Sequence, residues 1–299
     1  MASAGALGVR TPIAGVRRLA ADYLALTKPK VQSLLLLTTI TTMEVAGSPS
    51  AGRVALTCLG GYLSAGGAGA VNHYWDRDID AQMKRTAGRP IPAGRISPGS
   101  ALAFGLTLAA VSFVLMSLTL NVLAASLALG GFLGYVGVYT MWLKRRTAQN
   151  IVIGGAAGAM PPLVGWAAAR GSVSWTAVYL FAIVFYWTPP HFWALSLLMK
   201  DDYAKASIPM MPVVRGEHET RRQILLYTLL LYAITQLPFC AGALGGIYLG
   251  CSMLLGLTFI GGAALLYRRA DRRSALRLYL FSLAYLALLF GAMVADVKL

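Results

Sequence analysis

Residues 97–143 read SPGSALAFGLTLAAVSFVLMSLTLNVLAASLALGGFLGYVGVYTMWL, and none of them is charged. About 20 consecutive apolar residues are enough to cross the hydrocarbon core of a bilayer as a helix. Asn121 divides this stretch into two runs of that length, which predicts two spanning helices, at 98–118 and 122–142. The stretch therefore indicates an integral membrane protein.

The rest of the chain follows the same pattern. Of its 299 residues, 57% are hydrophobic and only 12% are charged, whereas a soluble protein has about 25% charged residues. Apolar runs of span length predict nine helices, at 31–47, 54–75, 98–118, 122–142, 150–169, 174–198, 222–240, 247–267 and 275–294. We therefore expect an all-α membrane protein with a tail at 1–30 and a single domain at 31–299.

The basic residues predict the orientation of these spans. Lys and Arg number 26 against 11 acidic residues. With the N-terminus inside, 23 of the 26 fall in inside segments, and only Arg53, Arg170 and Lys298 lie outside. Because short cytoplasmic loops are enriched in Lys and Arg, this split predicts a cytoplasmic N-terminus and an outside C-terminus.

The same distribution bears on partners and location. Basic residues that separate apolar runs, instead of forming one stripe, favour the lipid bilayer as partner and argue against nucleic acid. The first 30 residues lack a cleavable secretory signal, which favours the bacterial plasma membrane; their low acid content leaves the mitochondrial inner membrane as the alternative. Cys58, Cys240 and Cys251 lie in apolar runs and are expected to be free, buried side chains.

Five of the 11 acidic residues lie in two short inside segments. The first reads NHYWDRDID, residues 72–80. On a helix, Asp76 lies about 40° and Asp80 about 80° from Asn72, while Asp78 points elsewhere. Three oxygen-bearing side chains on one face suit Mg²⁺, which takes one or two carboxylates and completes its shell with substrate phosphates and water. The alternative is that these acids only form structural ion pairs.

A second acidic segment and a basic turn lie on the same side of the membrane. The acidic segment includes Asp201, Asp202 and Lys205, and the basic turn is Lys144-Arg145-Arg146. Carboxylates that hold a metal, together with cations that hold phosphates, are the groups needed to ionise a diphosphate ester. The combination favours a magnesium–diphosphate site over structural ion pairs.

At these residues the chain resembles the UbiA superfamily of intramembrane prenyltransferases. Asn72, Asp76 and Asp80 match the first acidic motif of that family. The resemblance covers nearly the whole chain from Lys28-Pro29 onward. It implies nine helices around a central cavity, with Mg²⁺ and a polyprenyl diphosphate at the cytoplasmic mouth.

Within the superfamily, the chain is most similar to the branch that farnesylates protoheme IX to give heme O. The strings that carry this similarity are RTAGRPIPAGRISP at 85–98, LKRRTAQNIVIGGAAGAMPPLVGW at 143–166 and TPPHFWALSLLMKDDYAKASIPMMPVV at 188–214. The quinone-forming branches usually carry two acids four residues apart in the second motif. Here Ala206 follows Asp202 and Lys205 follows Asp201 at that spacing, so the second motif departs from the quinone-forming pattern, and both Asp201 and Asp202 are kept as candidate ligands.

The resemblance implies a role for each candidate residue. Farnesyl diphosphate and protoheme IX are the expected substrates, and Mg²⁺ the expected cofactor. The metal ligands would be Asn72, Asp76, Asp80, Asp201 and Asp202; the substrate-binding residues would be Asn72, Arg89, Lys144, Arg145 and Lys205; and the catalytic residues would be Asp76, Asp80, Tyr139 and His191.

Two of these assignments keep alternatives. Tyr139, with Tyr135 and Trp75 behind it, is expected to stabilise an allylic cation, although aromatic residues at helix ends are also interfacial anchors. His191 lies well inside the predicted span 174–198, which makes it a functional candidate. Its alternatives are iron ligation, a hydrogen bond to a propionate, proton handling, or a hydrogen bond between helices.

Other functions remain open at this stage. The alternative within the enzyme class is an aromatic prenyltransferase that acts on a quinone or chlorophyll precursor. A secondary transporter is the alternative from another class, but transporters bury coupling charges near the bilayer midplane, whereas most acids here lie at cytoplasmic ends. A heme A synthase or a terminal oxidase assembly is a possible protein partner of the heme branch.

Overall fold

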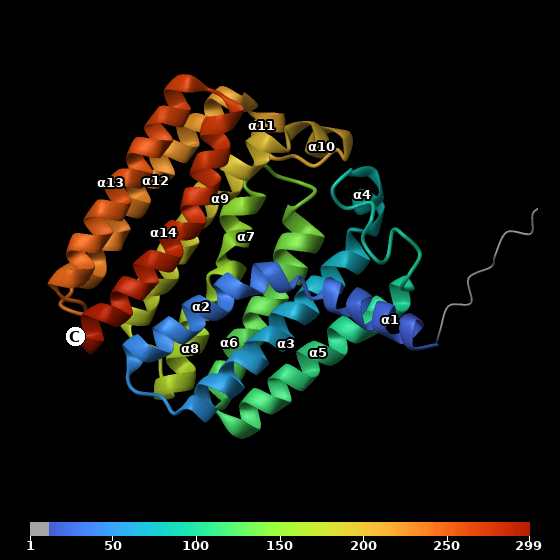
Figure 1. Cartoon of the computed structure of the whole chain (residues 1–299), viewed down its shortest axis with the longest axis horizontal. Helices are drawn as coiled ribbons and strands as arrows, with labels where there is room; N and C mark the ends of the chain where they lie inside the picture. Colours follow the sequence, from blue (N-terminus) through green and yellow to red (C-terminus); the bar gives the residue numbers. More distant parts are fainter. Residues whose placement is uncertain (1–11) are drawn as a thin grey trace, which may run out of the picture.

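The structure is a computed structural model that describes residues 12–299, and within them every regular element is helical (Figure 1). A long helix or helix pair occupies each predicted span. Their bounds are α2 Pro29–Ala46, α3 Ala51–Trp75, α5 Pro98–Thr119, α6 Val122–Leu133 continued by the π-helix η1 Gly134–Leu143, α7 Asn150–Gly158 followed by α8 Met160–Arg170, α9 Trp175–Leu198, α12 Gly216–Cys240, α13 Gly246–Arg269 and α14 Arg272–Lys298. The predicted all-α class is confirmed.

Seven of these segments are long and apolar enough to cross a membrane: α3, α5, α6 with η1, α7 with α8, α12, α13 and α14. Helices α2 and α9 lie at the two remaining predicted spans and fall outside that set. Helix α2 carries Lys30 and Glu44, and α9 carries Pro189, Pro190 and His191, which make both less apolar. The chain is thus a multi-pass membrane protein, and the total of nine spans stays a prediction.

Side-chain caps explain where several helices begin. A side-chain oxygen just before the first turn accepts a hydrogen bond from a backbone N–H three residues on, which satisfies one of the otherwise unpaired donors there. The capping residues are Ser50, Ser97, Asn121, Ser174 and Asp271. Each lies at a boundary between an apolar run and a polar connection, so the sequence encodes both the span and its start.

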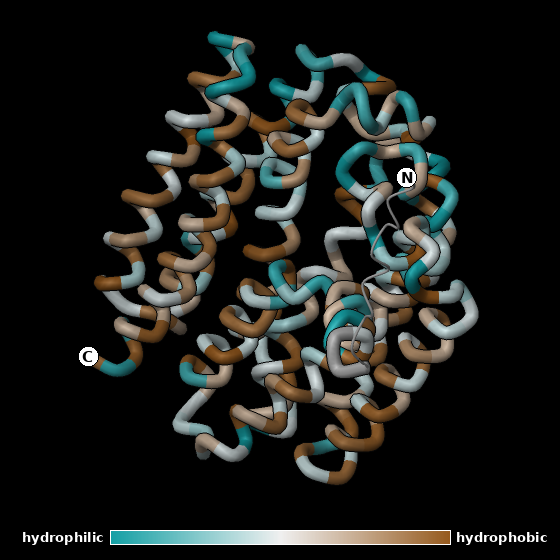
Figure 2. Tube along the Cα trace, turned by 45° about the vertical axis from the view of Figure 1, so that its right-hand side comes forward, coloured by the Kyte–Doolittle hydropathy of each residue, from teal (hydrophilic) through white to brown (hydrophobic). Residues whose placement is uncertain are grey.

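The connections gather at two ends of the bundle. Three short helices lie at one end: α4 Arg77–Gln82, α10 Lys200–Lys205 and α11 Met211–Val214 (Figure 1). Hydrophilic residues concentrate in the loops of this end (Figure 2). At the other end, Lys298 pairs with Glu44 at 3.0 Å, and Arg170 donates a hydrogen bond to the carbonyl of Ala46. The predicted inside and outside segments are therefore separated in the structure.

Close packing of α3 against α5 positions the helix that carries the acidic motif. A Cβ atom added at Gly67 would lie 2.5 Å from the carbonyl oxygen of Gly105, and one added at Gly105 would lie 2.8 Å from that of Gly67. Small residues allow such close approach between helices in lipid. A side chain at either glycine would push α3 away from α5.

Helix α1, Pro12–Leu26, lies within the predicted tail, of which residues 1–11 are outside the described part of the chain. Asp22 of α1 pairs with Arg95 at 2.9 Å, in the loop between α4 and α5. The tail is therefore tied to the end of the bundle that carries the acidic segments. Its assignment as a separate unit stays a prediction.

The three cysteines are free, as expected, but they are not buried. Cys240 is exposed, and Cys58 and Cys251 are partly exposed. The predicted burial is wrong because an apolar helix in a membrane protein also presents apolar side chains outward, toward lipid.

Candidate active site

The acidic motif lies at the end of α3 and the start of α4. Helix α3 ends at Trp75, but Asp76 N–H still donates to the Asn72 carbonyl at 2.9 Å, and Asp80 N–H to the Asp76 carbonyl at 2.8 Å. The four-residue steps are thus preserved through the junction. Asn72, Asp76 and Asp80 are all buried, whereas the Asp78 side chain is 56% exposed. The predicted sharing of one face by these three residues is confirmed.

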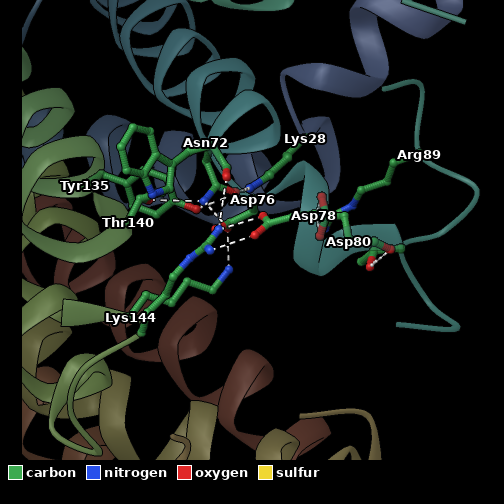
Figure 3. A network of polar contacts seen from close by, with 12 residues as sticks. Lys28, Asn72, Asp76, Asp78, Asp80, Arg89, Tyr135, Thr140 and Lys144 are labelled. Carbon is green, nitrogen blue, oxygen red and sulfur yellow. Dashed lines mark hydrogen bonds and ion pairs between the residues drawn. The ribbon is translucent and has the colours of Figure 1, made fainter. Parts of the chain in front are cut away.

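Asn72 and Asp76 are held in a hydrogen-bonded network (Figure 3). The Asn72 amide nitrogen donates to Asp76 Oδ2 at 2.7 Å and to the Thr140 hydroxyl at 3.1 Å. Lys144, which directly follows η1, donates to the same Asp76 oxygen. The sequence analysis placed Lys144 only on the same side of the membrane as the acidic motif. In the structure, Lys144 lies directly beside the Asp76 carboxylate.

Asp80 is paired with Arg89. The Arg89 Nη1 atom lies 2.8 Å from Asp80 Oδ1 and 2.7 Å from Oδ2, so one guanidinium nitrogen contacts both carboxylate oxygens (Figure 3). Thr86 fixes the backbone here by donating its hydroxyl to the Asp80 carbonyl at 2.9 Å. Thr86 and Arg89 both lie in the loop between α4 and α5. This loop folds back so that the Arg89 side chain contacts the acidic motif.

Arg145 contacts the exposed acid of the motif. Its two terminal nitrogens donate to Asp78 at 2.7 and 2.8 Å, and Nη2 also donates to the Trp75 carbonyl at 3.1 Å. The Arg145 guanidinium lowers the pKa of Asp78 below its ordinary value. Nη2 lies 3.7 Å from Asp76 Oδ1, so Arg145 stands at the edge of the buried network.

Lys28 is a site residue that the sequence analysis missed. Its ammonium donates to Asn72 Oδ1 at 2.6 Å and to the Tyr135 hydroxyl at 3.2 Å. Burial, followed by the nearby Arg89 guanidinium, lowers the pKa of Lys28 to about 7. Lys28 adopts a φ of 54°, which turns the chain into α2 just before Pro29. The Lys28-Pro29 pair is the signal in the sequence that could have identified Lys28 as a site residue. The sequence analysis counted Lys28 only among the inside basic residues, and used the pair only as the start of the family resemblance.

The aromatic candidates lie on η1. The ring centroids of Tyr135 and Tyr139 are 5.4 Å apart. The ring of Tyr139 packs directly against Gly154 of α7, where any Cβ would overlap it. In η1, Lys144 N–H bonds to the Tyr139 carbonyl five residues back, the spacing of a π-helix, which is often found at functional sites. Beyond Tyr139, Thr140 accepts a hydrogen bond from Asn72 and Lys144 donates one to Asp76, so this end of η1 contacts the acidic motif.

The second acidic segment forms α10 at the same end of the bundle. Tyr203 of α10 packs with Ile79 of α4 and Ile151 of α7 in one buried cluster, which joins both acidic segments and the turn before α7. Asp201 and Lys205 are exposed, and Asp202 is partly exposed. Within residues 12–299, no three acidic, histidine or cysteine side chains are placed to hold a metal ion. A metal role for Asp201 and Asp202, and substrate binding by Lys205, stay predictions.

One observation on the motif itself fits a cation. Asp76 Oδ1 is buried and accepts no hydrogen bond among the described residues. A buried carboxylate oxygen without a hydrogen bond is costly, and a hard divalent cation would satisfy it. The donor set of Asn72, Asp76 and Asp80, all oxygen, is the chemistry that Mg²⁺ prefers.

His191 joins α9 to α14. Its Nδ1 lies 2.6 Å from Ser282 Oγ, and Ser282 in turn donates to the Tyr279 carbonyl at 2.6 Å. Since the serine proton is used there, His191 Nδ1 must donate, and Nε2 keeps its lone pair. The imidazole stacks between Trp187, at 4.3 Å, and Tyr279, at 4.9 Å. The structure thus contains the hydrogen bond between helices that was one of the alternatives for His191. It joins α9 to α14 and uses only Nδ1 of the imidazole.

The other histidines differ in setting. Both ring nitrogens of buried His73 lack a hydrogen-bond partner among the described residues, next to Asn72 in sequence. His218 is exposed and contacts Tyr267. A pocket of about 320 Å³ lies at the far end of the bundle, beside Arg53 and Arg170, and does not belong to this site. The central cavity implied by the resemblance stays a prediction.

Comparison with known proteins places this site in a family. The UbiA prenyltransferase family model matches residues 34–289. The chain is 55% identical over 291 residues to a protoheme IX farnesyltransferase from Chloroflexus aurantiacus, covering 97% of this chain and 49% of that protein. It is 52% identical to a protoheme IX farnesyltransferase from Symbiobacterium thermophilum, covering 92% of this chain and 94% of that protein. The chain thus spans about half the length of some relatives and nearly all of another.

A solved structure shares the fold. A UbiA homolog from Archaeoglobus fulgidus, bound to DMAPP and Mg²⁺, superposes with a TM-score of 0.68 over 93% of this chain and 99% of its own, at 16% identity. The family match covers most of the chain, including the acidic motif and η1. The chain belongs to the UbiA prenyltransferase family.

Proposed function

We propose that the protein transfers a farnesyl group from farnesyl diphosphate to a vinyl group of protoheme IX, with addition of water, to give heme O. The observation that carries this proposal is the 52% identity to the S. thermophilum protoheme IX farnesyltransferase over 94% of that protein. The buried acidic motif with its basic partners supports the diphosphate half of the reaction. The sequence alternative of a secondary transporter has no comparable support.

The diphosphate would bind at the end of the bundle that carries α4. Lys144, Arg145 and Arg89 are the cations that neutralise charge as it develops on the departing diphosphate, and Lys28 lies beside them as a fourth. Mg²⁺, which the A. fulgidus homolog binds together with DMAPP, would be held by Asn72, Asp76 and Asp80 and would stabilise the same charge. Asp201 and Asp202 are proposed to complete its ligands, and Lys205 to contact the diphosphate.

In the first bond-breaking step, the allylic carbon of the farnesyl group separates from the diphosphate. The bond between the farnesyl carbon and the diphosphate oxygen breaks, and its electron pair leaves with the diphosphate. The farnesyl cation that remains needs a site without bulk water and with negative aromatic faces nearby. Tyr139 and Tyr135 on η1, adjacent to Lys144 and Lys28, are proposed to supply those faces.

The heme vinyl group is the nucleophile and needs no activation by a protein nucleophile. Its π electrons form the new carbon–carbon bond, which leaves a positive centre on the carbon next to the porphyrin ring. Water adds to that carbon and releases one proton, so atoms and charge balance. His191 is proposed to position the heme through Nε2, by binding the iron or a propionate, or to accept the proton.

The location follows from the family and the charge distribution. We propose that the protein lies in a plasma membrane, with the N-terminus and the diphosphate site facing the cytoplasm and the C-terminus outside. The 23-to-3 split of basic residues supports this orientation. A heme A synthase or a terminal oxidase assembly is the proposed protein partner, because heme O must pass to an enzyme or oxidase that uses it.

The test is an acceptor panel with purified protein in lipid nanodiscs. Farnesyl diphosphate and Mg²⁺ are supplied with protoheme IX, with 4-hydroxybenzoate or with a naphthoate, and products are identified by mass spectrometry. The proposal predicts a farnesylated product from protoheme IX only. Prenylation of an aromatic acid instead of protoheme IX would favour the aromatic prenyltransferase alternative.

A further inference from the structure

The side chains proposed to hold the metal are occupied by the protein's own cations. Lys28 donates to Asn72 Oδ1, Lys144 pairs with Asp76, and Arg89 contacts both oxygens of Asp80. In the network drawn in Figure 3, each member of the Asn72–Asp76–Asp80 face contacts a basic side chain, and Arg145 also lies 3.7 Å from Asp76. The same basic groups are those proposed above to bind the diphosphate.

The basic side chains of this network already neutralise its carboxylates. Three carboxylates, Asp76, Asp78 and Asp80, face the cations Arg89, Lys144 and Arg145, with Lys28 beside them. A divalent cation that arrives alone meets no net negative charge and must displace Arg89 from Asp80. A diphosphate that arrives alone must separate the same cations from their carboxylates. Either ligand alone therefore leaves one buried charge without its partner, which is costly.

We propose that Arg89 and Lys144 are exchangeable counter-ions, which leave the carboxylates for the diphosphate when a divalent cation takes their place, so that metal and diphosphate bind cooperatively. This inference rests on the proposed function, since it assumes that the site takes both ligands. Arg89 is best placed for the exchange, because it belongs to a loop and not to a membrane helix. Arg95, in the same loop, pairs with Asp22 and not with a carboxylate of the acidic motif.

Cooperativity of this kind has a thermodynamic signature that an enzyme assay does not provide. If the diphosphate raises the affinity for the metal by some factor, the metal must raise the affinity for the diphosphate by the same factor. Removal of Arg89 frees Asp80 in advance. The metal alone then binds more tightly, and the diphosphate adds less. A merely structural Arg89 predicts the opposite, namely weaker metal binding because the motif is disordered.

The experiment titrates Mn²⁺, a spectroscopic substitute for Mg²⁺, into full-length protein in nanodiscs and detects bound Mn²⁺ by electron paramagnetic resonance. Each titration is run with and without farnesyl diphosphate, with heme omitted so that no transfer occurs, and a protein-free titration corrects for Mn²⁺ bound by free diphosphate. Farnesyl diphosphate binding with and without Mn²⁺ is measured in parallel. Arg89→Gln is compared with Arg95→Gln as the matched control from the same loop.

We expect farnesyl diphosphate to raise the Mn²⁺ affinity of the wild-type protein by about tenfold or more, with the same factor in the reciprocal titration. Arg89→Gln should bind Mn²⁺ alone more tightly than wild type and show a smaller gain, while Arg95→Gln should behave as wild type. Equal Mn²⁺ affinity with and without the diphosphate, or weaker Mn²⁺ binding in Arg89→Gln, overturns the exchange. The wild-type titrations decide the coupling even if Arg89→Gln fails to insert. Independent binding of both ligands would leave the proposed function standing, whereas no binding of farnesyl diphosphate in any titration would overturn both.

Discussion

Asp76 and Asp78 are two residues apart and lie in opposite environments. The Asp76 side chain is fully buried between Asn72 and Lys144, whereas that of Asp78 is 56% exposed and pairs with Arg145. Asp76→Ala and Asp80→Ala should therefore lower the transfer rate by about 10²-fold or more, because each removes a carboxylate proposed to hold the metal. Asp78→Asn should cost about tenfold or less.

The measurement is the initial rate of transfer as a function of Mg²⁺ concentration, in variants whose insertion is checked by their yield in the membrane and their thermal unfolding. Equal losses in all three variants would show that burial does not separate the roles of these acids. Asp201→Ala and Asp202→Ala in the same series would identify which of them contributes to metal affinity.

Gly154 sets the position of the Tyr139 ring. A Cβ at residue 154 would overlap that ring, whereas one at Gly158, in the same helix, meets no atom within 4 Å. Alanine favours a helix over glycine by about 1 kcal/mol, so neither Gly154→Ala nor Gly158→Ala should unfold α7. We expect Gly154→Ala to lower kcat by about tenfold or more, because misplacement of a group near the reacting atoms by about 1 Å is enough to do so. Gly158→Ala should keep the wild-type kcat. A wild-type rate in Gly154→Ala would show that the position of Tyr139 does not matter for transfer.

His191 separates heme binding from diphosphate binding. The His191→Ala variant should lose heme farnesylation and bind heme more weakly, which a heme titration monitored by absorbance measures. Its binding of farnesyl diphosphate should keep the wild-type Mg²⁺ dependence. Ser282→Ala removes the hydrogen bond that fixes the imidazole and should have a smaller effect of the same kind. If His191→Ala makes heme O at the wild-type rate, the hydrogen bond of His191 to Ser282 is only a packing interaction, and His191 does not position the heme.

The topology can be tested by labelling single cysteines. Cys58, Cys240 and Cys251 are first replaced by serine, since Cys240 is exposed. Cysteines introduced at residues next to Arg95, Arg145, Arg215 and Arg272 should then react with an impermeant reagent from the cytoplasmic side only. Those next to Gly171 and Lys298 should react from the outside only. A reversed label at any position would remove one span from the predicted nine.

The long helices could be predicted from the sequence because each is a local property of about 20 residues. The helix starts at Ser50, Ser97 and Ser174 follow from local capping in the same way. The shared face of Asn72, Asp76 and Asp80 also follows from one periodicity, and the structure confirms it even though α3 ends at Trp75. Features that depend on a single helix were thus accessible.

Features that depend on contacts between helices were not. Lys28 is 44 residues from Asn72, and their contact depends on how the start of α2 packs beside the end of α3. The pairing of Arg89 with Asp80 requires the loop after α4 to fold back, and that of Tyr139 with Gly154 requires α7 to lie against η1. The burial expected for the cysteines was wrong for the related reason that apolar patterning does not separate a lipid-facing side from a protein-facing side.

The central claim is transfer of a farnesyl group to protoheme IX with addition of water. Its most direct test is the reaction of purified protein with farnesyl diphosphate, Mg²⁺ and protoheme IX in water enriched in ¹⁸O, followed by mass spectrometry of the porphyrin. The account predicts a product with the mass of protoheme IX plus one farnesyl group and one hydroxyl group, which carries ¹⁸O and forms more slowly, by about 10²-fold or more, in Asp80→Ala. A porphyrin recovered unchanged, or a farnesylated porphyrin without ¹⁸O, would contradict it.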